Sequence, residues 1–247
     1  SKLRLRQLKN YINLSSSLKL KKTKIFINNN LISLEYINNK IKAYNKNPFD
    51  ILDNEKTSNQ VLTIYNNVIG NLRIGKYDLA IDNLNKLFIR FENYPFLFEL
   101  YGDIYFDKGE FNKAIEYYKK AIEVLNYKSA KSTELIKFSL VKSFLQTKDI
   151  NNLNKSVRIL EQLIKDNPRW SYLWRLLAKA SGRTNQKGIS YIALAEEAFI
   201  KKNFLKAQKY VSLAFKYPQL SKEYRLRGKD ILFRVKAQRW KNFIKQE

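Results

Sequence analysis

Apolar residues recur three and four positions apart along almost the whole chain, which is the spacing of amphipathic α-helices. Alternation of the kind found in strands is confined to one short stretch, residues 24–27. Only 7 glycines and 4 prolines interrupt the 247 residues, too few for a turn-rich β architecture. The pattern therefore predicts an all-α protein.

A repeat of 34 residues runs through the middle of the chain. Three residues at one turn and the following helix return 34 positions later in the same order: Gly75, Tyr77 and Ala80 as Gly109, Phe111 and Ala114. This is the period of the tetratricopeptide helix-turn-helix repeat. The chain is therefore expected to form a solenoid of helical hairpins.

Residues 95–126 match that repeat best. Its large positions, which fill the space between paired helices, hold Phe98, Tyr101, Tyr105 and Tyr118. Its small positions, where the helices approach most closely or pack on the next repeat, hold Gly102, Ala114 and Ala121. Asn126 stands where proline is common and is the one clear departure.

Weaker repeats flank this one. Residues 61–92 fit mainly in their second helix, and residues 133–168 fit with extra residues in the turn near 149–152. A further first helix, which contains Trp174, is followed by residues 188–219, the last good repeat. Residues 182–188 leave no room for a separate second helix. The helix from about Ile189 is therefore predicted to serve two repeats.

The predicted organisation has three parts. Residues 1–56 form a non-repeat extension with helices at 1–12 and 30–44, residues 57–220 form the repeats, and residues 221–247 form one long basic helix. A solenoid needs an atypical terminal helix to cover its last exposed core face. Capping is therefore the expected role of the tail.

Composition excludes several chemistries. The chain has no His and no Cys, so a histidine-ligated zinc, an HExxH protease site, a catalytic triad and a disulfide framework are all absent, and no catalytic or metal-binding residues are predicted. No apolar run reaches the roughly 18 residues of a membrane span. A chain that begins at Ser1 and lacks Met is expected to be an excerpt or a processed product.

Positive charge is concentrated at the two ends. The net charge is +25, and residues 1–60, 61–131, 132–199 and 200–247 carry +8, +1, +5 and +11. Such a field attracts nucleic acid, anionic lipid or acidic protein surfaces. Lysines on helix faces and aromatic residues at core positions argue against a dedicated nucleic-acid site. The tail could still dock on an acidic partner or phosphate surface through Arg225, Arg227, Arg234 and Arg239.

The first helix of each hairpin in such repeats lines a groove. Residues of these helices that do not pack in the core are candidate partner contacts. Mapped onto this chain, these residues are Tyr65, Arg73, Glu99, Asp103, Asp107, Lys142, Arg175, Lys179, Arg183 and Glu196. The charge of these side chains changes from acidic at the best repeat, residues 95–126, to basic beyond it. Such a groove suits an extended or helical peptide of complementary charge. Asp103 and Asp107 lie one turn apart, but no third group accompanies them, so we interpret them as a surface pair rather than an acid–base site.

The order of these segments resembles the C-terminal half of certain bacterial zinc metalloproteases, in which tetratricopeptide repeats follow an HExxH domain. The periplasmic β-barrel assembly-enhancing protease and its α-proteobacterial relatives are the type. The stretches that carry the resemblance are residues 1–9, 98–109, 167–178 with Gly182, 192–199 with Ala207, and 224–231. The strong positive charge departs from what we expect of this group.

The resemblance implies a non-catalytic domain that recruits substrate or outer-membrane assembly partners for a periplasmic zinc metalloprotease. It also implies contact with the protease domain itself, and zinc would belong only to that domain. Two alternatives stay open from the residues alone. One is a stand-alone helical-repeat adaptor, and the other is an RNA or anionic-membrane binder that works through the basic ends.

Overall fold

A computed structural model describes residues 38, 40–54, 60–91, 94–126 and 133–244, the last six of these by their backbone only. Within these ranges the regular structure is helical, as predicted, and contains no strands. The strand-like stretch 24–27, the helix predicted at 1–12 and most of the one predicted at 30–44 lie outside the described residues. The end of the latter is present as a helical segment at 40–45.

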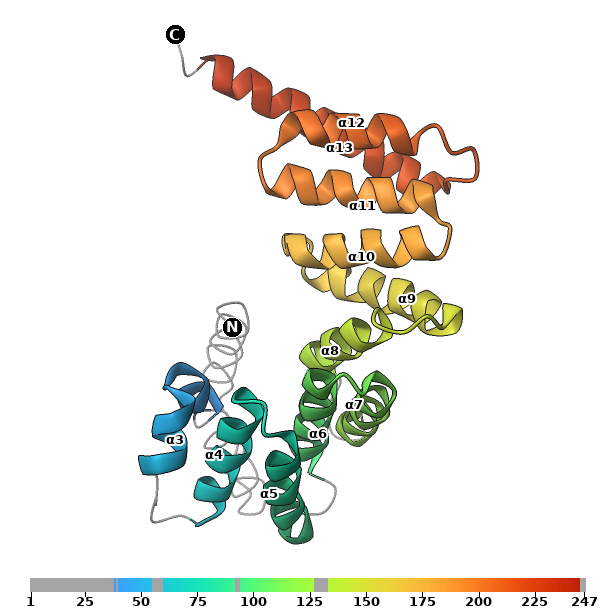
Figure 1. Ribbon diagram of the computed structural model, residues 1–247. Helices are drawn as coiled ribbons and strands as arrows, with labels where there is room; N and C mark the ends of the chain where they lie inside the picture. The colour runs from blue at the N-terminus through green and yellow to red at the C-terminus, as the bar shows by residue number, and fades with distance from the viewer. Residues whose placement is uncertain (1–37, 39, 55–59, 92–93, 127–132, 245–247) are drawn as a thin grey trace, which may run out of the picture. The chain divides into compact units, whose positions relative to one another are not determined.

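The chain divides into two compact units between Val124 and Leu125. Along the chain to Asn126 the helices are α3 (Pro48–Asn54), α4 (Gln60–Arg73), α5 (Tyr77–Arg90), α6 (Pro95–Lys108) and α7 (Phe111–Asn126). The second unit contains α8 (Glu134–Phe144), α9 (Ile150–Asp166), α10 (Ser171–Arg183), α11 (Lys187–Ile200), α12 (Phe204–Ala214) and α13 (Lys222–Ile244) (Figure 1). The limits predicted at residues 57 and 220 stay predictions, and the division near residue 124 has no counterpart among them.

Four of the hairpins close on the same kind of turn. Gly75, Gly109, Asn185 and Lys202 follow α4, α6, α10 and α11 and have positive φ angles of 77°, 85°, 59° and 61°. In each turn the next N–H donates to a carbonyl five residues earlier, as from Glu110 to Tyr105 at 2.8 Å. This left-handed closure satisfies carbonyls at the helix end, and glycine adopts it at the least cost.

The helix α11 packs against both α10 and α12, as the shortage of chain between residues 182 and 188 predicted. Its Ala193 belongs to the core shared with α9 and α10, whereas its Ile192, Ala195 and Ala198 belong to the core shared with α12 and α13. Asn185 before it and Lys202 after it make the same turn 17 residues apart, half of the 34-residue period. One helix therefore completes two successive hairpins.

Small residues lie where paired helices approach most closely. A Cβ added to Gly102 of α6 would meet the Tyr118 ring of α7 at 2.6 Å, and Ala114 is fully buried. At the equivalent place between α10 and α11, the Ser190 hydroxyl donates to the Ala178 carbonyl at 2.8 Å. These contacts set the spacing of the helices on which the predicted groove positions lie.

Candidate functional site

The acidic groove positions of the first unit are covered by the chain itself. Lys40, in the helical segment 40–45, places its Nζ 3.1 Å from Glu99 Oε1 and 3.9 Å from Asp103 Oδ2. Asp103 is buried and also accepts a hydrogen bond of 2.8 Å from the Tyr118 hydroxyl. The exposed Asp107 therefore does not form a surface pair with Asp103, contrary to the sequence interpretation.

Tyr65 and Arg73 are engaged by the same segment. Tyr65 is buried, and this burial raises its pKa far above the usual value, although Lys40 opposes the shift. Arg73 Nη1 donates to the carbonyls of Ala43 and Lys46 at 2.6 Å each, and its guanidinium lies 5.9 Å from the Tyr44 ring centre. Four of the five predicted groove residues in this unit therefore contact the helical segment 40–45 or the residue that follows it. The fifth, Asp107, is exposed to solvent.

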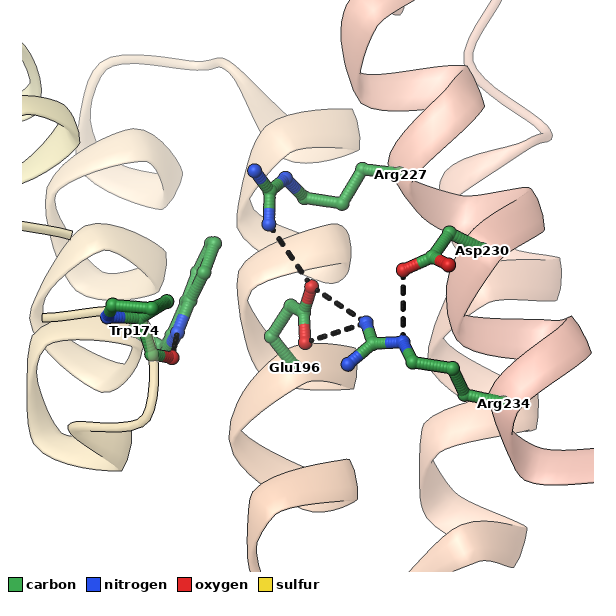
Figure 2. Close-up of polar contacts among 6 residues, drawn as sticks. Trp174, Glu196, Arg227, Asp230 and Arg234 are labelled. Carbon is green, nitrogen blue, oxygen red and sulfur yellow. Dashed lines mark hydrogen bonds and ion pairs between the residues drawn. The ribbon is translucent and has the colours of Figure 1, made fainter. Parts of the chain in front are cut away.

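In the second unit, the basic tail reaches the predicted groove residue Glu196 (Figure 2). Arg227 Nη1 lies 3.1 Å from Glu196 Oε1, and Arg234 Nη2 lies 3.0 Å from Oε1 and 3.1 Å from Oε2. Arg227 also lies 5.0 Å from the Trp174 ring centre, so α13 touches α10 as well as α11. A carboxylate on α11 thus accepts two arginines that lie seven residues apart on α13.

Two more tail residues hold α13 in place. The Tyr224 hydroxyl donates to Glu161 Oε1 of α9 at 2.5 Å, and burial together with this contact raises the tyrosine pKa strongly. Arg225 donates to the carbonyls of Tyr217, Pro218 and Leu220 at 2.9–3.2 Å. Three of the four tail arginines predicted to meet a partner therefore bind this chain. The side chain of Arg239 lies outside the described residues.

Three of the remaining groove positions, together with a tyrosine that the sequence did not single out, form a basic surface on α8 and α10. We name it the α8–α10 basic surface and define it by Lys142, Tyr172, Arg175 and Lys179. Phe138 links the two helices, since its ring centre lies 5.9 Å from that of Tyr172 and 5.9 Å from Lys142 Nζ. Tyr172, Arg175 and Lys179 follow on successive turns of α10, and both cations are exposed. This surface combines positive charge with a half-exposed aromatic ring.

Glu197 anchors one edge of this surface. Its carboxylate lies 2.6 Å from Arg175 Nη2 and 2.5 Å from Lys201 Nζ. Burial by itself raises the Glu197 pKa, but the hydrogen bonds from Arg175 and Lys201 outweigh it and hold the pKa below its usual value. Because the Arg175 side chain remains 56% exposed, its guanidinium is oriented by Glu197 and still reachable from solvent.

Arg183 has a structural role. It donates to the carbonyls of Leu145 and Thr147 at 2.6 Å each, beyond the C-terminus of α8. Arg73 makes the matching contact at the C-terminal end of the helical segment 40–45, with the carbonyls of Ala43 and Lys46. Each arginine is the last residue of the first helix of a hairpin. The repeat alignment could therefore have predicted that the two are equivalent, but it could not have predicted which carbonyls they bind.

Several contact residues were missed from sequence. Lys40, Tyr172 and Glu197 complete the surfaces above. Trp174, named from sequence only as part of a first helix, donates its indole N–H to the Pro168 carbonyl at 2.9 Å. Lys40 and Glu99 lie 59 residues apart in sequence, and no local spacing signals such a pair. Over the described part of the chain, no group of three or more acidic residues is placed to hold a metal ion. No helix there is both long enough and apolar enough to cross a membrane.

Comparison with known proteins supports the repeat fold. The tetratricopeptide-repeat family matches residues 97–124, within the repeat that fits best by sequence. A solved structure of a MamA RS-1 ArsTM double mutant is similar at 12% identity and a TM-score of 0.53, covering 74% of this chain and 97% of that one. A crystal structure of MamA is 18% identical with a TM-score of 0.49, covering 71% and 95%. No curated protein matches the sequence.

The chain is therefore a tetratricopeptide-like, all-α helical-repeat protein with a long basic terminal helix that packs on the last hairpins. Helical repeats of this kind are typically scaffolds for protein–protein interaction rather than catalysts. The metalloprotease relationship implied by the sequence resemblance has no counterpart among these comparisons.

Proposed function

We propose that this chain is a protein-interaction domain that binds an acidic peptide segment on the α8–α10 basic surface. The observation that carries the proposal is the pair Arg175 and Lys179, exposed one turn apart on a first helix beside Tyr172. Glu197 holds the Arg175 guanidinium in position before a ligand arrives, which lowers the cost of ordering it. The acidic groove positions support the same choice, because the chain's own cations already occupy Glu99, Asp103 and Glu196.

The ring of Tyr172 gives the surface more than charge. It lies against Phe138, which in turn stacks on Trp170 at a ring-centre distance of 4.9 Å. Aromatic residues beside cations are typical of contacts that dominate binding energy. We therefore expect the bound segment to combine Asp or Glu residues with at least one apolar side chain.

A binding titration with charge-reversed variants tests this proposal. The probe is the tightest binder from an array of Asp- and Glu-rich peptides that each carry one Leu or Phe, measured by fluorescence anisotropy. Combined Arg175→Glu and Lys179→Glu substitution is expected to weaken binding at least about thirtyfold, because attraction is replaced by repulsion at two contacts.

The matched control is the combined Lys155→Glu and Lys165→Glu variant on α9, where both lysines are exposed. It makes the same change in net charge away from the proposed surface, and binding is expected to stay within about twofold of the unmodified chain. Equal weakening by the two double variants would show attraction to net charge alone and would contradict the proposal.

A finer proposal concerns the protein to which this domain belongs. The sequence resemblance supports a periplasmic zinc metalloprotease in which the repeats recruit barrel substrates or assembly partners, with zinc held only by the protease domain. Its first test is the coding sequence upstream of Ser1. A signal peptide followed by an HExxH helix is the expected result, and Arg175→Glu would then slow cleavage of a barrel substrate. A start codon close to Ser1 with no protease domain would leave a stand-alone adaptor.

A further inference from the structure

The helix α13 has one face that none of the described residues of the second unit covers. Its inner face is formed by Tyr224, Gly228, Ile231 and Val235, all of which are buried. A Cβ added to Gly228 would meet the Phe215 ring at 2.7 Å, so this face packs tightly. On a neighbouring face, Arg227 and Arg234 point toward Glu196 (Figure 2). The residues opposite this packed side are therefore turned to solvent.

Two large apolar residues lie on the solvent side of α13. Leu226 is 56% exposed and Phe233 is 73% exposed. They are seven residues apart, which is close to two helical turns, so they lie in one row along the helix. The exposed Ala237 continues this row one turn beyond Phe233. Such a narrow stripe has the width of a helix–helix seam rather than of a broad apolar face.

A row of lysines runs beside the apolar row. Lys222, Lys229 and Lys236 are exposed and are also spaced by seven residues. Lys229 lies three residues after Leu226, and Lys236 lies three residues after Phe233, so each lysine adjoins an apolar residue on the same side. Within the described structure these three ammonium groups have no ion-pair or hydrogen-bond partner, unlike Arg225, Arg227 and Arg234.

We infer that the face of α13 formed by Leu226, Phe233, Lys229 and Lys236 is a docking site for an acidic amphipathic helix of a partner protein. The partner's apolar residues pack on Leu226 and Phe233, and its carboxylates lie along the lysine row, as charges flank the seam of a coiled coil. Asp230, whose side chain is 59% exposed, lies on the other side of the apolar row with its Oδ2 2.8 Å from Arg234 Nε, so that side presents a paired carboxylate instead of a row of free ammonium groups. This asymmetry selects one orientation of the partner helix.

The same observations favour a protein helix over a membrane surface. Binding at a bilayer interface needs a wider apolar face and a polar face that is positive throughout. Here the apolar row is narrow, and the exposed Glu223 and Asp230 would face anionic headgroups. A second copy of α13 is disfavoured as well, because its lysine row would repel this one. The inference does not depend on the α8–α10 basic surface, which lies on other helices.

The test uses the whole chain and a designed probe. The probe is a labelled synthetic helix of about three heptads with Leu at the seam positions and Glu at the flanking positions, followed by fluorescence anisotropy. Phe233→Ala is expected to weaken its binding about tenfold, and because Phe233 is exposed the fold should be unaffected, as checked by circular dichroism. Combined Lys229→Glu and Lys236→Glu substitution is expected to weaken it more than tenfold. The same variant should gain affinity for a probe with Lys in place of Glu.

Three controls make the outcome decisive. The combined Lys206→Glu and Lys209→Glu variant on α12 changes the net charge equally and should bind the Glu probe almost normally, as should Arg175→Glu with Lys179→Glu. A loss in either control, or full binding by Phe233→Ala, would overturn the inference. It would also be overturned if vesicles of phosphatidylserine and phosphatidylcholine, rather than the probe, captured the chain in a Phe233-dependent manner. If only the array peptides fail to bind, the function proposed for the α8–α10 basic surface fails and this inference stands.

Discussion

Replacing Gly102 with alanine is expected to lower the free energy of unfolding by about 2–3 kcal/mol. The added methyl group would lie 2.6 Å from two carbon atoms of the Tyr118 ring, well inside contact distance. The ring cannot easily withdraw, because Tyr118 is 1% exposed and its hydroxyl donates to Asp103 at 2.8 Å. Urea denaturation followed by circular dichroism measures the change. The comparison requires that the free energy of unfolding falls with urea concentration at the same slope in both chains.

Gly182 provides the matched control for this substitution. It also lies in a first helix, but it is exposed, and an added Cβ would be 3.5 Å from the nearest atom outside its own turn, Ser190 Oγ. Gly182→Ala is therefore expected to raise the free energy of unfolding by about 0.5–1 kcal/mol, since alanine loses less backbone entropy in a helix. If the two variants change the free energy of unfolding by the same amount, the close approach of α6 and α7 is not the reason why residue 102 must be glycine.

Glu196→Gln is expected to cost about 2–3 kcal/mol and to act mainly on α13. The substitution keeps the shape of the side chain but removes the charge that pairs with Arg227 and Arg234. Breaking a fully buried ion pair costs more, but these arginines are 39% and 33% exposed and regain part of their hydration. Hydrogen exchange of the backbone amides of residues 224–238 should therefore become faster than in the unmodified chain.

Two further variants separate the arginine contacts from a general loss of charge. Glu197→Gln removes a neighbouring carboxylate that binds Arg175 and Lys201 instead, so exchange in α13 should not change. When Arg227 and Arg234 are already glutamine, Glu196→Gln should cost much less than it does alone. Unchanged exchange in α13 on Glu196→Gln would show that the apolar inner face holds this helix without the ion pairs.

Much of the repeat architecture could be predicted because it depends on local chemistry. Gly109 favours the left-handed turn by its lack of a side chain, and small residues such as Gly102 and Ala114 mark where helices meet. The double use of α11 also followed from the length of chain available between residues 182 and 188. The same type of turn at Asn185 and Lys202 was not predicted, since neither residue type requires it.

The candidate site was predicted less well, and Arg183 and Glu196 show why. Both were assigned from sequence to helix faces that packing does not use, but Glu196 is buried where α13 packs on α11, and the role of each residue depends on what lies opposite. Arg183 meets the carbonyls that follow α8, 36–38 residues earlier, and Glu196 meets arginines 31 and 38 residues later. Helix periodicity gives the direction of a side chain on its own helix but carries no information about distant partners.

The sequence by itself determined that this protein is a helical-repeat array with basic ends, because period, small residues and net charge are properties of the chain. Only the tertiary structure decided which charges are already neutralised and which remain for a partner. Lys40, Arg227 and Arg234 fold back onto carboxylates of the groove, whereas Lys229 and Lys236 stay on the outer face of α13. Residues of equal charge thus have different roles, because the packing of whole helices sets their distance to an opposite charge.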